Sequence, residues 1–487
     1  MRCGLSLAWL CAGTALLAGP AEALTPDLSD LNSLPLAMVH APLAKRIEAA
    51  AGKSRPFQFA VKAPLPVSLA DGSWDRIDAD TARWRMRVAS PGAQSLGFEF
   101  SHFHLPQGGA LWIYDAAGQL IQGPYTAADE TPEGKLWTAV VLGDQAVLEL
   151  RVASSLREAV QLELDNVAHG FRGFDQAEAV PPKSGSCNVD AVCPQGDAWR
   201  GEIRSVARIT IDNTFRCSGQ LLNNTRQNND PLFITANHCE IGQNACGPAG
   251  TSECSPSSVV FYWNYFNSSC RSATGTADRN GNGSLSQSQS GASLLAGDVT
   301  SDFTLLRLAQ APPSAYNVYL AGWNAGNNVP HSGIAIHHPS GDEKSLAIFS
   351  SDAERATTQI DNNRNVDSWG VHWSQGTTEQ GSSGGGLWDE NHLIVGWLSG
   401  GEATCSTPSG EDFFGRMEVA WLGNSAPSGQ LKAWLAPDGG DALSLCGKNQ
   451  SGGKCDNSNA PTEQRGGGLE WISLLLLGLM AALRRQS

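Results

Sequence analysis

The sequence predicts an all-β protein built from two folded units. The chain has 487 residues, of which 53 are glycine and only 17% are charged. Short β-branched or aromatic stretches alternate with turn residues, which favours strands over long surface helices. At roughly 150 residues per domain the length allows about three units, but all-β domains are often longer. We therefore expect two β-rich domains between processed ends.

The charge balance excludes one class of partner. The chain carries 33 basic and 48 acidic residues, a net charge of −15. Nucleic-acid binding needs clustered Lys and Arg side chains. We therefore expect no nucleic-acid partner.

Residues 1–23 have the features of a secretory signal cleaved by signal peptidase. A basic Arg2 precedes an apolar stretch at 5–17, and Ala21-Glu22-Ala23 has the small-x-small pattern of the cleavage site. Lipidation at Cys11 is an alternative, although the residue before it is leucine rather than a small residue. Export is expected in either case.

The first folded unit is expected within residues 24–183. Strand-like stretches at 111–114, 136–141 and 147–152 are separated by turn residues, a pattern typical of an antiparallel sandwich. We predict a β-sandwich over about 81–166, preceded by a less regular region. The Pro-rich run 181–186 then marks the domain boundary.

The second unit is expected within residues 184–436. Strand signals continue at 259–265 and 303–308, and a short helix is plausible at 429–435. About 250 residues are ample for a two-lobed β structure with a large core.

The cysteines lie in the second unit and in the segment that follows it. Signal cleavage removes two of the 12 cysteines, and the remaining ten all lie at or beyond Cys187. An even number of cysteines in an exported chain indicates disulfides, here five.

The carboxyl terminus has the composition of a sorting tail. Residues 437–465 form a disulfide-containing linker, and 466–468 are glycines followed by a mostly apolar run at 469–483 and Arg484-Arg485. A helix of 15 residues is only about 22 Å long, short of a comfortable membrane span. A buried terminal helix is the alternative. Residues 466–487 resemble the Gly-Gly tails of Gram-negative exported proteins, which a rhomboid-type membrane protease removes.

Three short motifs suggest nucleophilic catalysis. Ser383 lies in a glycine-rich turn in which backbone N–H groups can converge on an oxyanion. His238 follows a strand-like stretch and precedes Cys239, with Cys217 upstream, so that a disulfide there would fix the backbone of a general base. Asp302 stands half-buried at the entrance of an apolar strand, where a carboxylate can orient an imidazole.

The order His238, Asp302, Ser383 is that of chymotrypsin-like proteases. Most of residues 187–436 closely resembles bacterial lysyl endopeptidase and its trypsin-like relatives. The resemblance rests on Cys187–Pro194, Tyr262–Tyr265, Asn267–Arg271, Ser301–Leu306 and Ile334–Pro339. It implies a two-lobed chymotrypsin-like double β-barrel.

The same resemblance implies the site. Ser383 would be the nucleophile, His238 the general base and acid, and Asp302 the orienting carboxylate, with the N–H groups of Gly381 and Ser383 as the oxyanion hole. The family's disulfides would be Cys187 with Cys405, Cys193 with Cys270, and Cys217 with Cys239. Elimination and proximity leave Cys246 with Cys254 and Cys446 with Cys455.

The resemblance also implies a specificity pocket. Asp412 matches the family's pocket carboxylate, which would pair with a basic substrate side chain; a solvated loop aspartate is the alternative. Glu402 and Glu411 are further acidic candidates near it. The segment departs from the family in three respects: Phe414 replaces Tyr, Ser399 replaces His, and neither Trp369 nor Trp373 is matched with the family's shielding tryptophan.

Two patterns have partial features of metal sites. Residues 278–283 resemble half of a calcium loop, but Gln289 replaces the bidentate Glu, so we interpret them as a polar turn. His337 and His338 are adjacent, point to opposite faces of a strand, and have no third ligand at a suitable spacing. We expect no metal and no organic cofactor.

Together these observations predict a secreted serine endopeptidase made as a zymogen, acting after Lys and possibly Arg on protein or peptide substrates. Self-cleavage after Lys183 would release the propeptide; a solvated linker charge is the alternative for that residue. The rival functions are a broader Arg/Lys protease and, more remotely, a non-catalytic surface-binding protein. We expect a monomer that is secreted or held at the surface of a Gram-negative cell, with the tail as a transient inner-membrane anchor.

Overall fold

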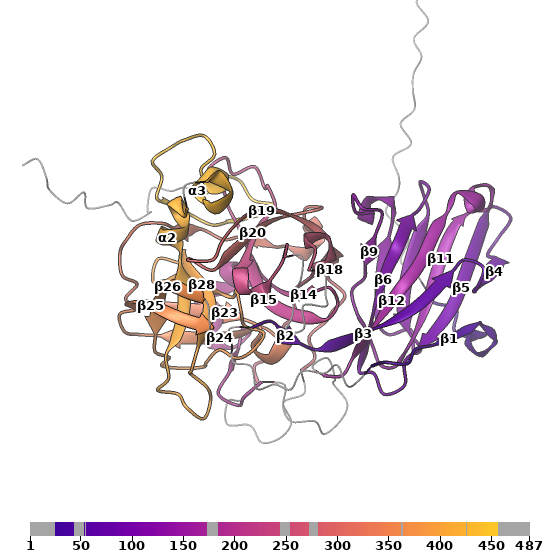
Figure 1. Ribbon diagram of the computed structural model, residues 1–487, viewed down its shortest axis with the longest axis horizontal. Coiled ribbons are helices and arrows are strands. Elements are labelled where there is room, and N and C mark those ends of the chain that lie inside the picture. Colours follow the sequence, from indigo (N-terminus) through magenta and orange to yellow (C-terminus); the bar gives the residue numbers. More distant parts are fainter. Residues whose placement is uncertain are drawn as a thin grey trace, which may run out of the picture.

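The computed structural model describes residues 25–42, 53, 55–172, 184–243, 254–271, 281–361, 364–424 and 426–455. They form an N-terminal β-sandwich beside a two-lobed β structure (Figure 1). Short helices connect or cap the strands. The predicted class, an all-β chymotrypsin-like double barrel preceded by a β-sandwich, is confirmed.

The sandwich consists of two sheets packed over a common apolar core. One has the order β1-β5-β11-β7-β8 with β4 on β5, and the other β10-β6-β12-β3 with β9 on β6. The strands of the first are β1 (Leu36–Met38), β4 (Ser73–Arg76), β5 (Thr81–Ala89), β7 (Ala110–Asp115), β8 (Ile121–Tyr125) and β11 (Gln145–Ala153). Those of the second are β3 (Ala60–Ser68), β6 (Ser95–His104), β9 (Leu136–Trp137), β10 (Val141–Leu142) and β12 (Gln161–Gly170). Buried side chains such as Trp84, Phe98 and Leu148 fill the space between the sheets.

The sandwich extends further in both directions than the predicted 81–166. Strands β1, β3 and β4 precede Thr81, and β12 continues to Gly170. Pro64 and Pro66 conceal β3 from pattern reading because proline cannot donate a ladder hydrogen bond. Their strand lies at the edge of its sheet, where that loss is tolerated.

The two lobes of the second unit each contain one large sheet. The first has the order β18-β17-β14-β15-β16-β20-β19, and the second β13-β24-β23-β27-β28-β29-β26-β25, with β22 and β30 attached. The first comprises β14 (Val206–Ile211), β15 (Phe215–Leu222), β16 (Leu232–Ala236), β17 (Val260–Trp263), β18 (Ser288–Ser290), β19 (Ala292–Asp298) and β20 (Phe303–Leu308). The second comprises β13 (Val189–Asp190), β22 (Trp323–Asn324), β23 (Gly333–His337), β24 (Ser345–Phe349), β25 (Glu354–Asp361), β26 (Arg364–Val371), β27 (Gly386–Asp389), β28 (Ile394–Gly401), β29 (Asp412–Arg416) and β30 (Ser444–Leu445). One apolar cluster joins the lobes, with Ile234 and Phe303 from the first packed among Trp388 and Trp397 from the second.

Helices are few and short in the described ranges. They are α1 (Arg200–Ile203), α2 (Met417–Leu422) and α3 (Lys432–Leu435). The helix expected at 429–435 is present as α3 after a 3₁₀ turn at Pro427–Gly429, and α2 was not expected. No helix in the described part is long and apolar enough to cross a membrane.

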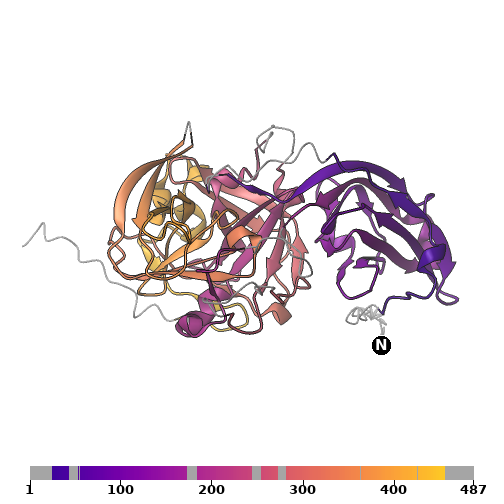
Figure 2. The same cartoon turned by 90° about the horizontal axis from the view of Figure 1, so that it is seen from below.

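The sandwich is joined to the first lobe by strand pairing and by a buried apolar cluster. Strand β2 (Phe57–Gln58) precedes β3 but pairs with β15 of the first lobe. Figure 2 shows this strand running from the sandwich toward the lobes. Phe59 and Trp137 then pack in one cluster with Tyr262 and Tyr265 of the first lobe.

The same contact interrupts a predicted strand. Residues 136–141 form the two short strands β9 and β10 instead of one. Between them, the backbone N–H of Val140 donates to the Tyr262 hydroxyl at 3.0 Å, across the interface. Since that N–H is used by the neighbouring lobe, it does not continue the sheet ladder.

Candidate active site

His238 and Asp302 meet because their strands pair. Strand β16 pairs antiparallel with β20, with Ala236 opposite Phe303, so the residues just beyond the pairing lie together. His238 Nδ1 lies 2.8 Å from Asp302 Oδ2, and the His238 backbone N–H donates to Oδ1 at 2.9 Å. One carboxylate therefore fixes both the ring and the backbone of the histidine.

The neighbouring residues restrain the His238–Asp302 pair. The Cys217–Cys239 disulfide ties β15 to the residue after His238. Asp302 has a positive φ of 53° and is completely buried, whereas the sequence indicated a half-buried side chain. Arg364 Nη1 lies 3.6 Å from Asp302 Oδ1, a neighbouring cation that the sequence did not reveal.

Ser383 lies in a turn that requires glycine. Gly381 and Gly384 have φ of +87° and +79°, in the left-handed region that glycine adopts without strain. A Cβ on Gly384 would lie 2.3 Å from Thr235 Oγ1, so the turn also packs too closely for a side chain. Cys239 Sγ lies 4.0 Å from the Ser383 carbonyl oxygen, which puts the turn beside the residue that follows His238.

The adjacent histidines each hydrogen-bond within the protein. His337 Nδ1 lies 2.8 Å from the Ser382 hydroxyl, and His338 Nδ1 lies 3.0 Å from the Asp342 carbonyl oxygen. Burial lowers the pKa of His337 to about 3. Within the described ranges, no group of three or more His, Cys, Asp or Glu side chains is arranged to hold a metal ion.

The Ser383 hydroxyl contacts a residue from the distant N-terminal region. Its Oγ donates to the backbone carbonyl oxygen of Lys53 at 3.0 Å. In the described part of the chain His238 Nε2 has no hydrogen-bond partner. The serine is therefore turned toward Lys53 and not toward the imidazole.

Asp412 is the partner of the same lysine. It begins β29, which lies between β28 and β26, and it is completely buried. Lys53 Nζ lies 2.5 Å from Asp412 Oδ1 and 2.5 Å from the Ala403 carbonyl oxygen. Burial lowers the pKa of Lys53, although the carboxylates of Asp412 and Glu379 oppose that shift.

Asp412 also receives hydrogen bonds from the walls of its pocket. Trp373 Nε1 and Thr378 Oγ1 each donate to Oδ2 at 2.7 Å, and the Ala403 N–H donates to Oδ1 at 3.3 Å. The sequence identified Asp412 but not Trp373 or Thr378 as its partners. Both residues lie on the segment between β26 and Ser383, far from Asp412 in the sequence. No local pattern therefore marks them as its partners.

The other two acidic candidates, and the positions at which the sequence departs from the family, have different surroundings. The Glu402 backbone N–H donates to the Glu411 carbonyl oxygen, and burial raises the pKa of the Glu411 carboxyl. In the described structure neither side chain hydrogen-bonds to Lys53. Ser399 is buried in β28, and Phe414 packs edge-on against Trp373 with ring centroids 5.9 Å apart.

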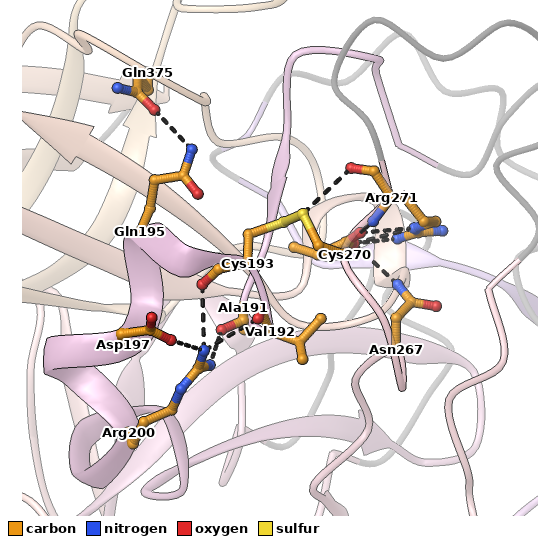
Figure 3. The surroundings of a disulfide bond; sticks show 11 residues. Ala191, Val192, Cys193, Gln195, Asp197, Arg200, Asn267, Cys270, Arg271 and Gln375 are labelled. Carbon is orange, nitrogen blue, oxygen red and sulfur yellow. Dashed lines mark hydrogen bonds and ion pairs between the residues drawn. A yellow bond between two sulfur atoms is a disulfide. The ribbon is translucent and has the colours of Figure 1, made fainter.

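Four disulfides join described residues. They are Cys187–Cys405, Cys193–Cys270, Cys217–Cys239 and Cys446–Cys455, the pairs expected from the sequence. Cys254 is disulfide-bonded, and its expected partner Cys246 lies outside the described residues. Figure 3 shows Cys193–Cys270 beside Arg271 and the Arg200 side chain that caps the carbonyls of Ala191, Val192 and Cys193.

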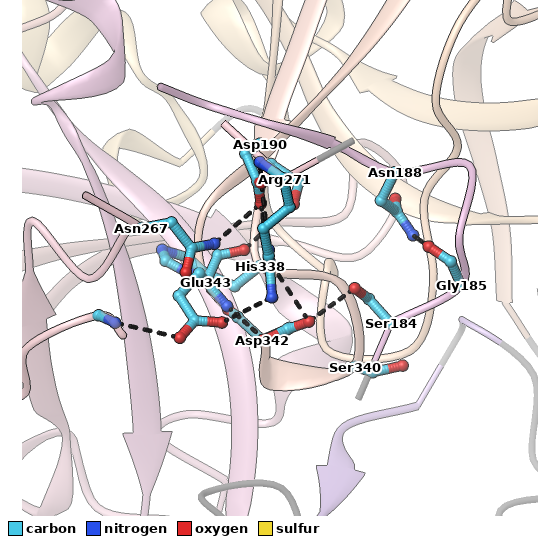
Figure 4. Close-up of polar contacts among 12 residues, drawn as sticks. Ser184, Gly185, Asn188, Asp190, Asn267, Arg271, His338, Ser340, Asp342 and Glu343 are labelled. Atoms are coloured by element: carbon cyan, nitrogen blue, oxygen red, sulfur yellow. Dashed lines mark hydrogen bonds and ion pairs between the residues drawn. The ribbon is translucent and has the colours of Figure 1, made fainter. Parts of the chain in front are cut away.

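The second unit begins in a buried polar cluster (Figure 4). Ser184 Oγ donates to Asp342 Oδ2 at 2.6 Å and is itself buried. Arg271 Nη2 lies 2.6 Å from Asp190 Oδ1 and 3.8 Å from Asp342 Oδ2. The chain is therefore anchored one residue after Lys183.

Several expected features lie outside the described residues. They are the signal at 1–23, Lys183, the calcium-like residues 278–280, and the tail beyond residue 455. These remain predictions.

The second unit is similar to known proteins. A sequence model of the lysyl endopeptidase C-terminal domain matches residues 182–415. A lysyl endopeptidase of Pseudomonas aeruginosa is 27% identical over 464 residues, covering 83% of this chain and 93% of the relative.

Solved structures of proteases are also similar. The Rv3671c protease of M. tuberculosis in its active form is 17% identical, with a TM-score of 0.31. The match covers 51% of this chain and 90% of that protein's chain. The HtrA-type protease AlgW with a tripeptide is 16% identical, covers 45% of this chain and 58% of its own, and has a TM-score of 0.28. Residues 182–415 are thus similar to the C-terminal domain of lysyl endopeptidase, and the chain is a serine endopeptidase acting on protein or peptide substrates.

Proposed function

We propose that the protein is a secreted serine endopeptidase, made as a zymogen, that cleaves after lysine. One observation carries this proposal. The Lys53 ammonium hydrogen-bonds to Asp412, and the Lys53 carbonyl oxygen accepts a hydrogen bond from the Ser383 hydroxyl. A substrate lysine would likewise place its ammonium on Asp412 and its carbonyl group beside Ser383 at the bond to be cut.

The proposed chemistry is acyl transfer. Ser383 Oγ attacks the carbonyl carbon while His238 Nε2 takes its proton, and Asp302 holds the imidazole and stabilises its charged form. The N–H groups of Gly381 and Ser383 stabilise the oxyanion. His238 then protonates the leaving amine, and water hydrolyses the acyl-enzyme by the same route in reverse. The contacts between His238 and Asp302 support these roles.

The donors around Asp412 favour Lys over Arg. Oδ2 already accepts from Trp373 and Thr378, so only Oδ1 faces the lysine. A guanidinium forms its strongest contact with both oxygens of a carboxylate, whereas an ammonium binds as a point charge. A carboxylate whose Oδ2 already accepts two hydrogen bonds therefore suits lysine better.

The zymogen would be activated by cleavage after Lys183, which separates residues 24–183 from the protease at 184–436. No cysteine between the signal and Lys183 ties the two parts covalently. The amino group created at Ser184 would arise beside the Asp342 carboxylate, which already accepts from the Ser184 hydroxyl at 2.6 Å. That carboxylate would stabilise the new terminus by ion pairing.

Export would use the terminal segments. Signal peptidase would remove residues 1–23, and a rhomboid-type protease would cut the Gly-Gly tail at 466–487 after transient anchoring. The basic Arg484-Arg485 would stay on the cytoplasmic side until that cut. Intact Arg485 on released enzyme would refute this route.

The nucleophile is tested by labelling and turnover. A fluorophosphonate should label the mature enzyme, and Ser383→Ala should abolish both labelling and peptide hydrolysis, with a loss of about 10⁶-fold in kcat as in other Ser-His-Asp proteases. Ser382→Ala is the matched control and should still be labelled. Labelling that survives in Ser383→Ala would overturn the assignment.

A further inference from the structure

Lys53 reaches Ser383 from a different unit of the protein. It lies 330 residues before the serine, just ahead of β2 and β3, which link the sandwich to the first lobe. Only 6% of its surface is exposed. Its carbonyl and ammonium contacts are both with the second unit, so neither lies within the sandwich itself.

The chain after Lys53 runs in the direction that a substrate requires. Strand β2 pairs antiparallel with β15, with Phe57 opposite Arg216 and Gln58 opposite Phe215. The next residue of β15, Cys217, is bonded to Cys239, directly after His238. Phe57 and Gln58, downstream of Lys53, therefore lie on the histidine's side, where the amine released by cleavage must receive its proton.

The carbonyl and ammonium contacts argue against a merely structural ion pair. A lysine that only neutralised Asp412 would have no need to bring its own carbonyl to the serine. Here the Ser383 hydroxyl donates to that carbonyl oxygen at 3.0 Å, while His238 Nε2 has no hydrogen-bond partner in the described part. A rotation of the hydroxyl toward the imidazole would convert this resting arrangement into a reactive one.

We propose that the peptide bond following Lys53 is a processing site, cut by Ser383 of the same chain. This inference rests on the proposed function. Ser383 Oγ would bond to the Lys53 carbonyl carbon as the peptide C–N bond breaks, and the serine's proton would pass through His238 to the amino group of Ser54. Water would then release Lys53 as a free carboxylate and restore the serine.

This cut would open the pocket without releasing the sandwich. Residues after the cut stay attached through β2 on β15 and through Lys62, whose Nζ lies 2.6 Å from Asp212 Oδ1. The part before the cut keeps β1, which pairs with β5 of the sandwich. Cleavage after Lys53 would therefore come first, and separation of the two units after Lys183 second.

The test follows the fragments formed when denatured precursor is diluted into refolding buffer. Mass spectrometry should detect an early amino terminus at Ser54, at a rate that does not change with protein concentration. Lys53→Gln should lose this cut and Ser383→Ala should show none. Lys135→Gln is the matched control, because Lys135 lies over the Trp137 ring within the sandwich; it should be cut like the wild type.

An added lysyl peptide separates the possible failures. If the wild type hydrolyses that peptide but never forms the Ser54 terminus, or forms it faster at higher concentration, cleavage within one chain is wrong. Lys53→Gln should still hydrolyse the peptide, which shows that the variant has folded. Loss of peptide hydrolysis in the wild type would refute the proposed function itself.

Discussion

Lys53 and Lys62 both leave the N-terminal region to pair with a buried carboxylate of the protease, but their surroundings differ. Lys53 Nζ lies 2.5 Å from Asp412, and Lys62 Nζ lies 2.6 Å from Asp212 and 2.8 Å from Glu99. Burial lowers the pKa of Lys53. Burial acts the same way on Lys62, but Asp212 and Glu99 outweigh it and its pKa lies above the usual value.

Under the proposed function, this difference separates an exchangeable contact at Asp412 from a permanent one at Asp212. Asp412 keeps the hydrogen bonds from Trp373, Thr378 and the Ala403 N–H when its lysine leaves. Asp212 is buried under the sandwich, and its ion pair holds two units together. A pocket that must accept many lysines needs the first arrangement, and an interface needs the second.

The largest effect is expected at Asp412. Asp412→Asn should lower kcat/KM for lysyl peptides by roughly two orders of magnitude, because the substrate ammonium loses its buried counter-charge. This corresponds to a loss of about 3 kcal/mol in transition-state stabilisation. Fluorophosphonate labelling should persist. Asp212→Asn in the mature enzyme is the control and should leave kcat/KM unchanged; equal losses in both variants would remove the distinction between the two carboxylates.

Loss of Lys62 should affect stability and not turnover. Lys62→Met in the Ser383→Ala precursor should lower the free energy of unfolding by about 3 kcal/mol, because Asp212 is left buried without its cation. Lys53→Met should cost less, since Asp412 keeps its other donors. Denaturant unfolding of the two variants measures this order, and a reversed order would contradict it.

A smaller effect is expected from the pocket wall. Trp373→Phe frees Asp412 Oδ2 from one donor and should shift the Lys-to-Arg ratio of kcat/KM toward Arg by about tenfold. Trp369→Phe is the control, because its Nε1 donates to the Val395 carbonyl instead. An unchanged ratio in Trp373→Phe would show that the occupied oxygen does not set the preference.

The smallest effect is a pH dependence at the sandwich contact. Burial raises the pKa of Asp212 to about 6, above its value of 3.8 in the unfolded chain. The folded precursor therefore holds this proton more tightly, and the contribution of Asp212 to stability falls as pH rises from about 4 to 6. The difference in Tm between the Ser383→Ala precursor and the same precursor carrying Asp212→Asn should follow this direction; a rise with pH would contradict it.

Local patterns in the sequence predicted the strands and the candidate residues, because strands such as β20 and turns such as Gly381–Gly384 show their preferences within a few residues. Strand β3 was missed because its prolines are tolerated only at a sheet edge, a property of the assembled sheet.

The residues that contact Asp412 could not be predicted from the sequence for a similar reason. Nothing near Lys53 distinguishes it from Lys62 or Lys183, and its importance arises from packing against residues more than 300 positions away. Trp373 and Thr378 likewise converge on Asp412 only after β26 and β29 pair. Such contacts follow from tertiary structure and leave no periodic signal.

Under the proposed function, Asp412 positions a substrate lysine so that its carbonyl group lies at Ser383. Mass-spectrometric identification of cleavage sites in a diverse peptide library, with mature enzyme, tests it most directly. Lysine should precede nearly every cut bond, with arginine a minor second. Cuts that follow aromatic or small residues, or a lysine preference that persists unchanged in Asp412→Asn, would contradict it.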